Sequence, residues 1–356
     1  MKTQSQIFAA VAATLVLASQ AQAAELTYAL WGGSWQDAQE IVHTRPFAAK
    51  SGVTSKIASY NGGIAQLRTQ VQTGNVTWDI VDMQLSDSMR ACDEGLLEKI
   101  NPAQDLAPAK DGTPASADFL PKGLNECLAG TIVWSTVLVY DKTKVGATEP
   151  AKVADFFDLK KYPGKRALRK SPEGALEWAL LADGVPAAQV YTVLGTPAGV
   201  DRALKKLDTI KPSIVWWEAG SQPPQLLADG EVVMTSAYNA RIYTAIVKDK
   251  KPFDFLWDGQ LKNVEGYSIV KGTKNLKDAK AFVRFATEPE RLAALAPLTA
   301  YGPMRKSAVG MVDPKVAPYL PTTPKNQVGA VEVDATFWAD HSDDLNQKFS
   351  AWLNRK

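Results

Sequence analysis

Short apolar strands alternate with amphipathic helices along nearly the whole chain from residue 25 onward. Leu26, Tyr28 and Leu30 alternate with small or polar residues in a first strand, and further strands are expected at 53–59 and 78–83. Helices between strands favour parallel pairing, because a parallel connection needs a crossover and usually takes a helix. The first hundred residues therefore predict a βαβαβα unit, and the chain as a whole an α/β fold with mostly parallel sheets.

The length of the chain predicts two lobes. Its 356 residues exceed the roughly 250–300 residues beyond which single hydrophobic cores usually split. A long apolar run at Thr131–Tyr140 is expected to cross between the lobes, and a strand at Gly266–Val270 to form a second crossing. With a ligand cleft between them, we predict a first lobe of 24–133 plus about 266–310, and a second of 134–265 plus about 311–356.

A C-terminal helix is expected at about Ala335–Leu353, because apolar side chains recur there at helical spacing. We expect this face to lie in the core and assign it no chemistry. Its members are Phe337, Trp338, Leu345, Phe349 and Trp352.

The first 23 residues have the pattern of a secretory signal peptide. A lone Lys2 precedes an uncharged stretch at 7–18, and Ala21-Gln22-Ala23 before Ala24 matches a small-x-small cleavage site. The apolar stretch is about twelve residues, too short for the roughly 20 residues of a spanning helix. We expect cleavage near Ala24 and a soluble chain exported to the periplasm. An uncleaved membrane anchor is the alternative.

The charges of the chain are balanced, with 40 basic residues against 38 acidic ones and a formal net charge of +2. Binding to nucleic acid or to an anionic membrane calls for a basic excess gathered in runs or stripes, which this balance does not supply. We therefore expect no nucleic-acid partner, and nothing in the sequence demands more than a monomer.

Cys92 and Cys127 are the only cysteines. In an oxidising compartment such an isolated pair is most simply one disulfide, which closes a loop of about 36 residues and contributes roughly 3–4 kcal/mol. Two buried free thiols are the alternative. Neither cysteine has metal-ligand spacing, and the two histidines, His43 and His341, lie far apart in sequence. We expect no metal site.

Motifs of enzymes and of cofactor sites are missing. The sequence contains no Gly-x-Ser-x-Gly elbow, phosphate-binding loop, Gly-x-Gly-x-x-Gly or His-Glu-x-x-His motif. Paired carboxylates such as Asp343 and Asp344 fall on expected helices, where a solvated face is the commoner explanation. We expect neither catalysis nor a cofactor.

Aromatic and polar side chains gather instead at the carboxyl ends of expected strands, where open α/β sheets bind ligands. The glycines of Trp31-Gly32-Gly33-Ser34 let a ligand approach backbone N–H groups at a helix start, although a plain tight turn explains them equally well. Further candidate contacts at strand ends are Gln84, Ser86, Tyr238 and Arg241.

Arg241 is the most informative of these residues. A guanidinium at the start of a helix faces the unfavourable end of the helix dipole, so it should have an anionic partner. That partner is either a carboxylate of the protein or a carboxylate of a ligand, and residue spacing does not decide between them.

Six stretches of the chain resemble the periplasmic solute-binding proteins of ABC transporters, in the spermidine/putrescine-binding group. The first two are Leu26–Ser34, with its Trp-Gly-Gly segment, and Trp78–Asp82. The others follow in the order that the family shows and bring the coverage to nearly the whole chain. They are Thr131–Thr136, Gly230–Asn239, Glu265–Val270 and Ala300–Pro303.

This resemblance implies a two-lobed periplasmic binding protein fold of type II, which closes on a small solute by a hinge motion. It implies ligand contacts from Trp31, Tyr238, Glu265 and Tyr301, and Ser135 is a further expected contact within one of the similar stretches. Aromatic faces and a carboxylate suit an ammonium group, through cation–π attraction of roughly 0.5–2 kcal/mol and a charge-assisted hydrogen bond. The implied partners are an amine-bearing solute and the permease subunits of the transporter.

The chain departs from the polyamine pattern where the departure bears on the ligand. Arg169–Gly174 stands where polyamine binders carry carboxylates, Asn263 replaces a Trp, and Arg241 stands where a small residue is common. Such a pocket is a poor host for a di- or trication, because like charges repel strongly where water is excluded. The hypothesis is a zwitterionic ω-amino acid such as γ-aminobutyrate (GABA), with its ammonium on Glu265 and its carboxylate on Arg241 and the Gly32-Gly33 backbone.

Other functions are left open at this point. Putrescine or spermidine binding requires only that Arg241 be paired with a carboxylate of the protein itself. A secreted hydrolase would use carboxylates across the cleft. Ferric-ion binders share the expected architecture, but they need clustered Tyr ligands, whereas the tyrosines here are dispersed.

Overall fold

The computed structural model describes residues 24–355. The predicted signal peptide, residues 1–23, lies outside the described residues. The strands are β1 (Glu25–Leu30), β2 (Thr54–Ser59), β3 (Ile80–Gln84), β4 (Ala129–Asp141), β5 (Arg166–Arg169), β6 (Ile214–Trp217), β7 (Met234–Tyr238), β8 (Phe253–Ile269), β9 (Gly302–Pro303) and β10 (Val331–Glu332).

Helices separate most of these strands, and none of them within residues 24–355 is both long and apolar enough to cross a membrane. A π-helix, η1 (Glu40–Thr44), joins the first two helices, and short 3₁₀ turns lie at Ala187–Gln189, Lys211–Ser213 and Ala317–Tyr319. The α-helices are α1 (Gly33–Gln39), α2 (Arg45–Ser51), α3 (Ala65–Gln72), α4 (Leu85–Asp93), α5 (Pro102–Asp105), α6 (Ala115–Asp118), α7 (Val153–Phe157), α8 (Pro172–Ala182), α9 (Val190–Leu194), α10 (Pro197–Asp208), α11 (Gln222–Ala228), α12 (Asn239–Val247), α13 (Leu276–Ala286), α14 (Pro289–Thr299), α15 (Lys306–Val309) and α16 (Ala335–Leu353).

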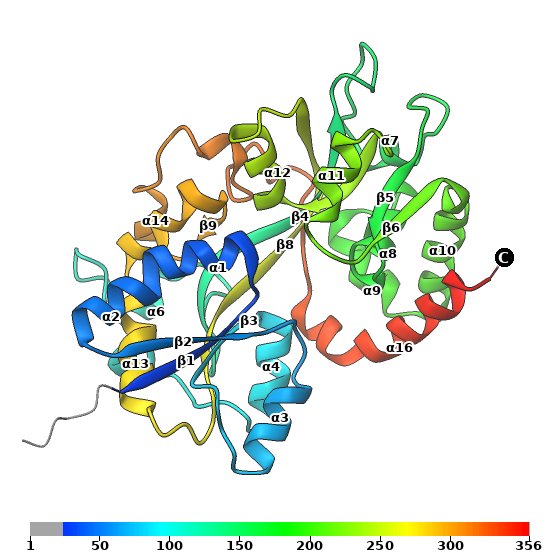
Figure 1. Cartoon of the computed structure of the whole chain (residues 1–356). Helices are drawn as coiled ribbons and strands as arrows, with labels where there is room; N and C mark the ends of the chain where they lie inside the picture. The colour runs from blue at the N-terminus through cyan, green and yellow to red at the C-terminus, as the bar shows by residue number, and fades with distance from the viewer. Residues whose placement is uncertain (1–23, 356) are drawn as a thin grey trace, which may run out of the picture.

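One continuous, curled sheet runs through the molecule in the order β2-β1-β3-β8-β4-β7-β5-β6, with helices packed on its faces (Figure 1). Strand β1 pairs in parallel with β2 and β3, and β5 pairs in parallel with β6 and β7. The centre is antiparallel, because β8 pairs in that sense with β3 and with β4, and β4 with β7. The predicted α/β fold is thus confirmed, with parallel strands in each half of the sheet and an antiparallel junction between them.

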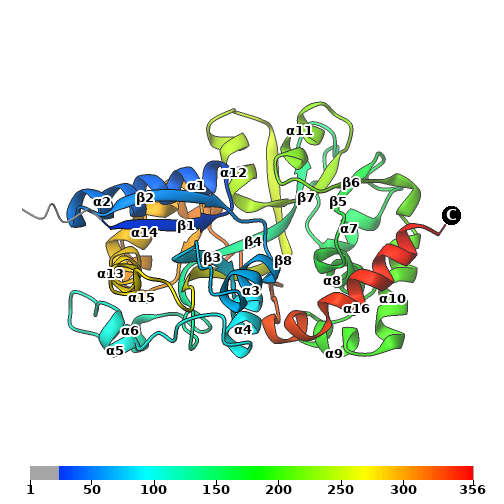
Figure 2. The ribbon, with the colours of Figure 1, turned by 60° about the horizontal axis from the view of Figure 1, so that its bottom comes forward.

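The two central strands, β4 and β8, are unusually long, at 13 and 17 residues. Figure 2 shows them running between the two halves of the molecule. The crossing predicted at Thr131–Tyr140 is the body of β4. The second crossing begins earlier than the sequence pattern indicates, at Phe253 rather than Gly266, because polar residues that pair with β4 continue the strand through an interval without apolar alternation. Glu265 therefore lies inside β8.

Separate apolar cores fill the two halves of the molecule. One core gathers β1, β3 and α13 around residues such as Tyr28 and Phe282, and the other gathers α8, α10 and α16 around residues such as Trp178 and Trp352. The division into two lobes, with its boundaries, stays a prediction.

The strongest sequence patterns correspond to the observed elements. The first hundred residues form the predicted βαβαβα succession, and the C-terminal helix spans Ala335–Leu353 with the five predicted apolar side chains buried. This helix contacts α4 in one half and α8 in the other. Arg90 of α4 lies 3.6 Å from Asp343 of α16, so the helix connects the two halves.

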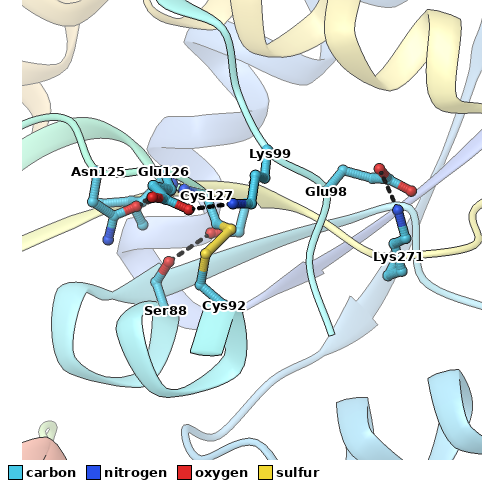
Figure 3. Close-up of a disulfide and its surroundings, with 10 residues drawn as sticks. Ser88, Cys92, Glu98, Lys99, Asn125, Glu126, Cys127 and Lys271 are labelled. Carbon is cyan, nitrogen blue, oxygen red and sulfur yellow. Dashed lines mark hydrogen bonds and ion pairs between the residues drawn. A yellow bond between two sulfur atoms is a disulfide. The ribbon is translucent and has the colours of Figure 1, made fainter. Parts of the chain in front are cut away.

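The predicted disulfide is present between Cys92 and Cys127 (Figure 3). It joins the last turn of α4 to the segment that leads into β4. In the same region the Ser88 hydroxyl lies 3.1 Å from the hydroxyl of Ser268 in β8. These links hold α4 against the central strands.

A buried ion pair holds the long excursion before β4 against the start of α15. The Arg305 guanidinium, with a fully buried side chain, donates to Asp118 at 2.6 Å and to the carbonyl oxygens of Ala107 and Thr287. Asp118 also accepts from the Ser307 N–H and hydroxyl. All partners of this pair come from within the protein, so we interpret it as structural.

Replacing Asp118 by Ala should lower the free energy of unfolding by about 3–5 kcal/mol, because it leaves the Arg305 guanidinium buried without its counter-charge. The matched control is Glu126→Ala, which removes the exposed pair with Lys99 and should cost at most about 1 kcal/mol. Urea denaturation of the three proteins measures both values. Equal losses in the two variants would contradict the structural role of the buried pair.

Candidate ligand-binding site

Five aromatic side chains from separate parts of the chain meet where the two halves of the sheet join. Trp31 follows β1, Trp35 lies in α1, Trp134 lies in β4, Tyr238 ends β7, and Tyr301 follows α14. Trp35 and Tyr301 pack edge to face with ring centroids 5.4 Å apart, as do Trp134 and Tyr238. Three of the five, Trp31, Tyr238 and Tyr301, are among the residues that the sequence predicts as ligand contacts.

The turn after β1 positions Trp31 and brings a guanidinium close to the backbone. Gly32 and Gly33 both have positive φ, 77° and 62°, a conformation that favours glycine. A Cβ atom on Gly33 would lie 2.8 Å from Nη2 of Arg241. Glycine therefore lets α1 begin directly beside the Arg241 side chain, as the predicted grouping of these residues requires.

Arg241 has no partner of its own within residues 24–355. No carboxylate oxygen of the described residues lies within ion-pair distance of its guanidinium, and no hydrogen bond from the side chain is formed among them. The side chain is half-buried and lies in the first turn of α12. Of the two partners that the sequence leaves open for Arg241, a protein carboxylate is not found in the described part of the chain.

Two carboxyl groups converge beneath the aromatic cluster. The indole N–H of Trp35 lies 2.7 Å from Oδ2 of Asp82 in β3 and 2.7 Å from Oε1 of Glu265 in β8. The neighbouring positions of β3 and β8 are register partners, which brings the two acids together. Asp82 is 0% exposed and Glu265 is 6% exposed, and neither forms an ion pair with any described cation.

Burial shifts the ionisation of both acids upward. It raises the pKa of Asp82 to about 6, against hydrogen bonds from neighbours such as Trp35 and Gln39 that lower it. Burial, followed by the charge of Asp82, raises the pKa of Glu265 well above its ordinary value. Two carboxylates cannot both stay charged in a dry site without a cation. Full ionisation of both acids is therefore disfavoured in the absence of a cation.

A buried polar network extends from Asp82 into the first half of the molecule. Gln39 donates to Asp82 Oδ2 at 3.0 Å and to the Tyr267 hydroxyl at 2.9 Å, and His43 Nδ1 lies 2.9 Å from the same hydroxyl. The π-helix η1 carries His43 one helical turn beyond Gln39 on the same side. Burial lowers the pKa of His43 to about 3, so this network is uncharged at neutral pH apart from the acids.

Several buried donors near the cluster lack partners among the described residues. Nε1 of Trp31 and Nε1 of Trp134 have no hydrogen-bond acceptor there, whereas the Asn263 side chain lies near enough to the Glu173 carboxyl to lower its pKa by hydrogen bonding. Trp134 and Asn263 are direct register partners in the pairing of β4 with β8. An unsatisfied buried donor costs about 1–3 kcal/mol. Donors of this kind beside a free guanidinium are typical of a site that takes an anionic group.

The remaining predicted contacts lie in other surroundings. The Ser135 hydroxyl is fully buried and donates to Oε1 of Gln260 at 2.7 Å, so it already has a partner inside the protein. Gln84 and Ser86 line a polar cavity of about 120 Å³ together with Glu173 and side chains of α16. Whether either residue contacts a ligand stays a prediction.

Sequence reasoning missed four members of the site as ligand contacts: Trp35, Asp82, Trp134 and Asn263. Asp82 carried one usable signal, since an acid inside an otherwise apolar strand run is rarely buried without a reason. Trp134 stands in the predicted crossing strand, but only the register with β8 shows that its ring faces the cluster. Trp35 follows the recognised Trp-Gly-Gly segment by two residues and resembles an ordinary core position of a helix.

The family model of bacterial extracellular solute-binding proteins matches residues 44–322. The chain belongs to this family. The expected resemblance is thereby confirmed, and the fold agrees with it, because solved periplasmic binding proteins superpose on nearly the whole described chain.

Individual relatives of this solute-binding protein are also close. It is 44% identical over 338 residues to a gamma-aminobutyric acid-binding protein of Pseudomonas aeruginosa, covering 95% of this chain and 93% of that one. A solved GABA receptor is 32% identical, with a TM-score of 0.82 and coverage of 93% and 98%. The binding protein MotA of A. tumefaciens B6, solved with glucopine, is 31% identical, with a TM-score of 0.81 and coverage of 93% and 100%.

The buried charge of Asp82 should cost this solute-binding protein stability at neutral pH. Because the pKa of Asp82 is raised to about 6 from an ordinary value of about 3.9, the folded state holds more protons than the unfolded state between these values. Stability is then full below about pH 4 and falls as pH rises through about 6. We expect Asp82→Asn to raise the free energy of unfolding by about 1–3 kcal/mol at pH 7.5, and by clearly less at pH 4.5.

Urea denaturation of both proteins at the two pH values measures this difference. The exposed acid Asp93, changed to Asn, is the matched control and should alter stability by no more than about 0.5 kcal/mol. A variant at Asp82 that is less stable than wild type at pH 7.5 would contradict the assignment.

Proposed function

We propose that this chain is the solute-binding component of an ABC import system and that it captures GABA or a closely similar ω-amino acid. The observation that carries the proposal is the separation of charge in one aromatic cluster, with an unpaired guanidinium at Arg241 and an acid pair at Asp82 and Glu265. A zwitterion supplies the missing partner of each.

Tyr301 supports the assignment of the two charged ends to one site. Burial raises the pKa of its hydroxyl, the charge of Glu265 adds to that rise, and the charge of Arg241 opposes it. Both groups therefore act on the same ring at short range. A solute lying along Tyr301 would have its ammonium near the acids and its carboxylate near the guanidinium, with no other charge required.

The unpartnered donors separate a zwitterion from a diamine. Trp31 and Trp134 each offer an N–H without an acceptor in the described residues. A carboxylate is an acceptor and can use such donors, whereas a polyamine at neutral pH carries only donors. The second ammonium of a diamine would also face Arg241, and like charges 4 Å apart repel by about 4 kcal/mol at an effective dielectric constant of 20.

The names of two relatives support the same solute. A relative at 44% identity is a gamma-aminobutyric acid-binding protein, and a solved structure at 32% identity is a GABA receptor. Aromatic faces around the amine would add cation–π attraction of about 0.5–2 kcal/mol. Trp31, Trp35 and Tyr301 lie in the same cluster and offer such faces.

Capture by closure of two lobes is part of the proposal. The aromatic cluster takes residues from 24–133 and from 134–265, the two predicted lobes, as well as Tyr301. The strands that join the lobes, β4 and β8, are the natural hinge, because closure about two strands needs only small changes in backbone angles. The closed form would then present a joint surface of both lobes to the permease subunits.

The setting of the protein follows from the same family. Its relatives are extracellular solute-binding proteins rather than enzymes, and a periplasmic location with permease partners in the inner membrane fits the predicted signal peptide. The hydrolase alternative is tested by a turnover assay on ester, phosphate and glycoside substrates. A tryptophan fluorescence change with GABA and no turnover would favour binding.

Calorimetric titration with GABA, putrescine and spermidine tests the proposed solute. We expect GABA to bind most tightly, and Arg241→Ala to weaken GABA binding at least about 30-fold, because loss of a desolvated charge partner costs about 2–5 kcal/mol. The matched control is Arg202→Ala, which removes an exposed guanidinium paired with Asp183 and should leave the affinity unchanged. Putrescine binding that Arg241→Ala does not alter, with no GABA binding, would refute the zwitterion.

A further inference from the structure

The two acids of the buried pair differ in exposure: Asp82 is 0% exposed and Glu265 is 6% exposed. We propose that Asp82 and Glu265 share one proton and present a single negative charge to the ammonium of the solute, so that Asp82 acts as a positioning residue that sets charge selectivity and pH dependence. This inference rests on the proposed function, because it takes a solute ammonium to lie against Glu265.

The hydrogen bonds assign the proton. Asp82 Oδ2 accepts from Trp35 at 2.7 Å and from Gln39 at 3.0 Å, whereas Glu265 has only its share of the Trp35 N–H. A carboxylate is stabilised by the donors it accepts from, so the charge belongs on Asp82 and the proton on Glu265.

The groups that face the pair from each neighbouring element leave this charge uncompensated. Helix α1 contributes the neutral Trp35 and Gln39, η1 contributes His43, and Thr131 of β4 bonds only the Glu265 backbone carbonyl. The nearby tyrosines stay protonated, because burial holds their pKa above its ordinary value. They are Tyr60, Tyr238, Tyr267 and Tyr301.

The neighbouring cations act elsewhere. Arg291 affects His43, Arg169 lies over the Tyr238 ring at 6.0 Å, and Arg241 affects Tyr238 and Tyr301. None of the three forms an ion pair with Asp82 or Glu265 within residues 24–355. Oδ1 of Asp82 also lacks a hydrogen-bond partner among these residues. The arrangement is thus incomplete until a cation occupies it.

Charge selectivity and pH dependence follow from the single shared proton. One negative charge matches one ammonium, and a second positive charge on the solute finds no counterpart. When pH falls below about 6, the pair gains its second proton, and binding must then expel it. Affinity should fall up to tenfold per pH unit there. A lone carboxylate of ordinary pKa would keep its affinity down to about pH 4.5.

The test is calorimetric titration of GABA at pH 7.5 and pH 5.0, each in two buffers of different ionisation enthalpy, which counts the protons exchanged. The charges of GABA itself change little in this interval, since a carboxyl titrates near 4.3 and an alkylamine near 10.4. We expect wild type to bind about tenfold more weakly at pH 5.0 and to release close to one proton per solute there. At pH 7.5 the release should be close to zero.

Asp82→Asn removes the second titrating site while keeping the shape of the side chain. It should bind GABA at pH 7.5 with its charge on Glu265, and its affinity ratio between the two pH values should differ from that of wild type, because only Glu265 is left to titrate. Asp87→Asn is the matched control: this nearby acid accepts from Tyr60 and Gly63 outside the pair, and the variant should keep the wild-type ratio. Equal wild-type affinities at both pH values without proton release, or an unchanged ratio in Asp82→Asn, would overturn the proposal.

The ionisation of the pair can also be read without any solute. In carbon-13 spectra of the ligand-free protein, the Glu265 carboxyl should stay protonated at pH 7 in wild type and should titrate at a lower pH in Asp82→Asn, because the charge of Asp82 no longer raises its pKa. A wild-type Glu265 that is ionised at pH 7 refutes the shared proton. If Glu265 is protonated but GABA does not bind, the proposed solute is refuted, whereas the shared proton of the acid pair is supported. If Asp82→Asn does not fold, the number of protons that wild type releases on binding and its carbon-13 spectrum still test the shared proton.

Discussion

The antiparallel pairing of β4 with β8 is the constraint on which the rest of the structure depends. It joins the two halves of the sheet, and its register places Trp134 opposite Asn263 and Glu265 within reach of β3. The strands approach so closely that a Cβ on Gly266 would collide with the backbone of Ala129 and Gly130. Glycine at this point is therefore a condition for bringing the acids, the indole rings and the hinge into one place.

The site contains two sets of groups without partners, donors without acceptors and acids without a cation, and each set is unfavourable alone. Arg241 and the free indole donors lack acceptors, and the carboxyl pair lacks a cation within the described residues. A stable structural core would pair these groups with each other, as Arg305 and Asp118 are paired elsewhere in the chain. Keeping them apart lowers the stability of the empty protein but leaves both to be satisfied by one small solute, which is how differential binding is obtained.

Sequence patterns predicted the fold better than they predicted the site, for a physical reason. Helix α16 and the βαβαβα unit follow from local periodicity, and the disulfide follows from the cysteine count and the expected oxidising compartment. All three could therefore be predicted from the sequence alone. Asp82 and Trp134 join the site only through strand register, which depends on contacts between residues far apart in sequence. The length of β8 was missed for the same reason, since its polar central residues are held by pairing with β4 and not by apolar alternation.

For Arg241 the sequence predicts the kind of partner, and the structure narrows which partner it is. Its place at a helix start predicts an anionic partner but allows either an internal acid or a solute, and only the absence of an acid within reach in residues 24–355 separates these possibilities. Asp82 presents the converse case. A buried acid in an apolar strand violates the rules of core composition, and such violations persist where function requires them. Asp82 and Glu265 both accept from the indole N–H of Trp35. In the proposal above, two acids that share one proton give the buried site the charge of a single carboxylate.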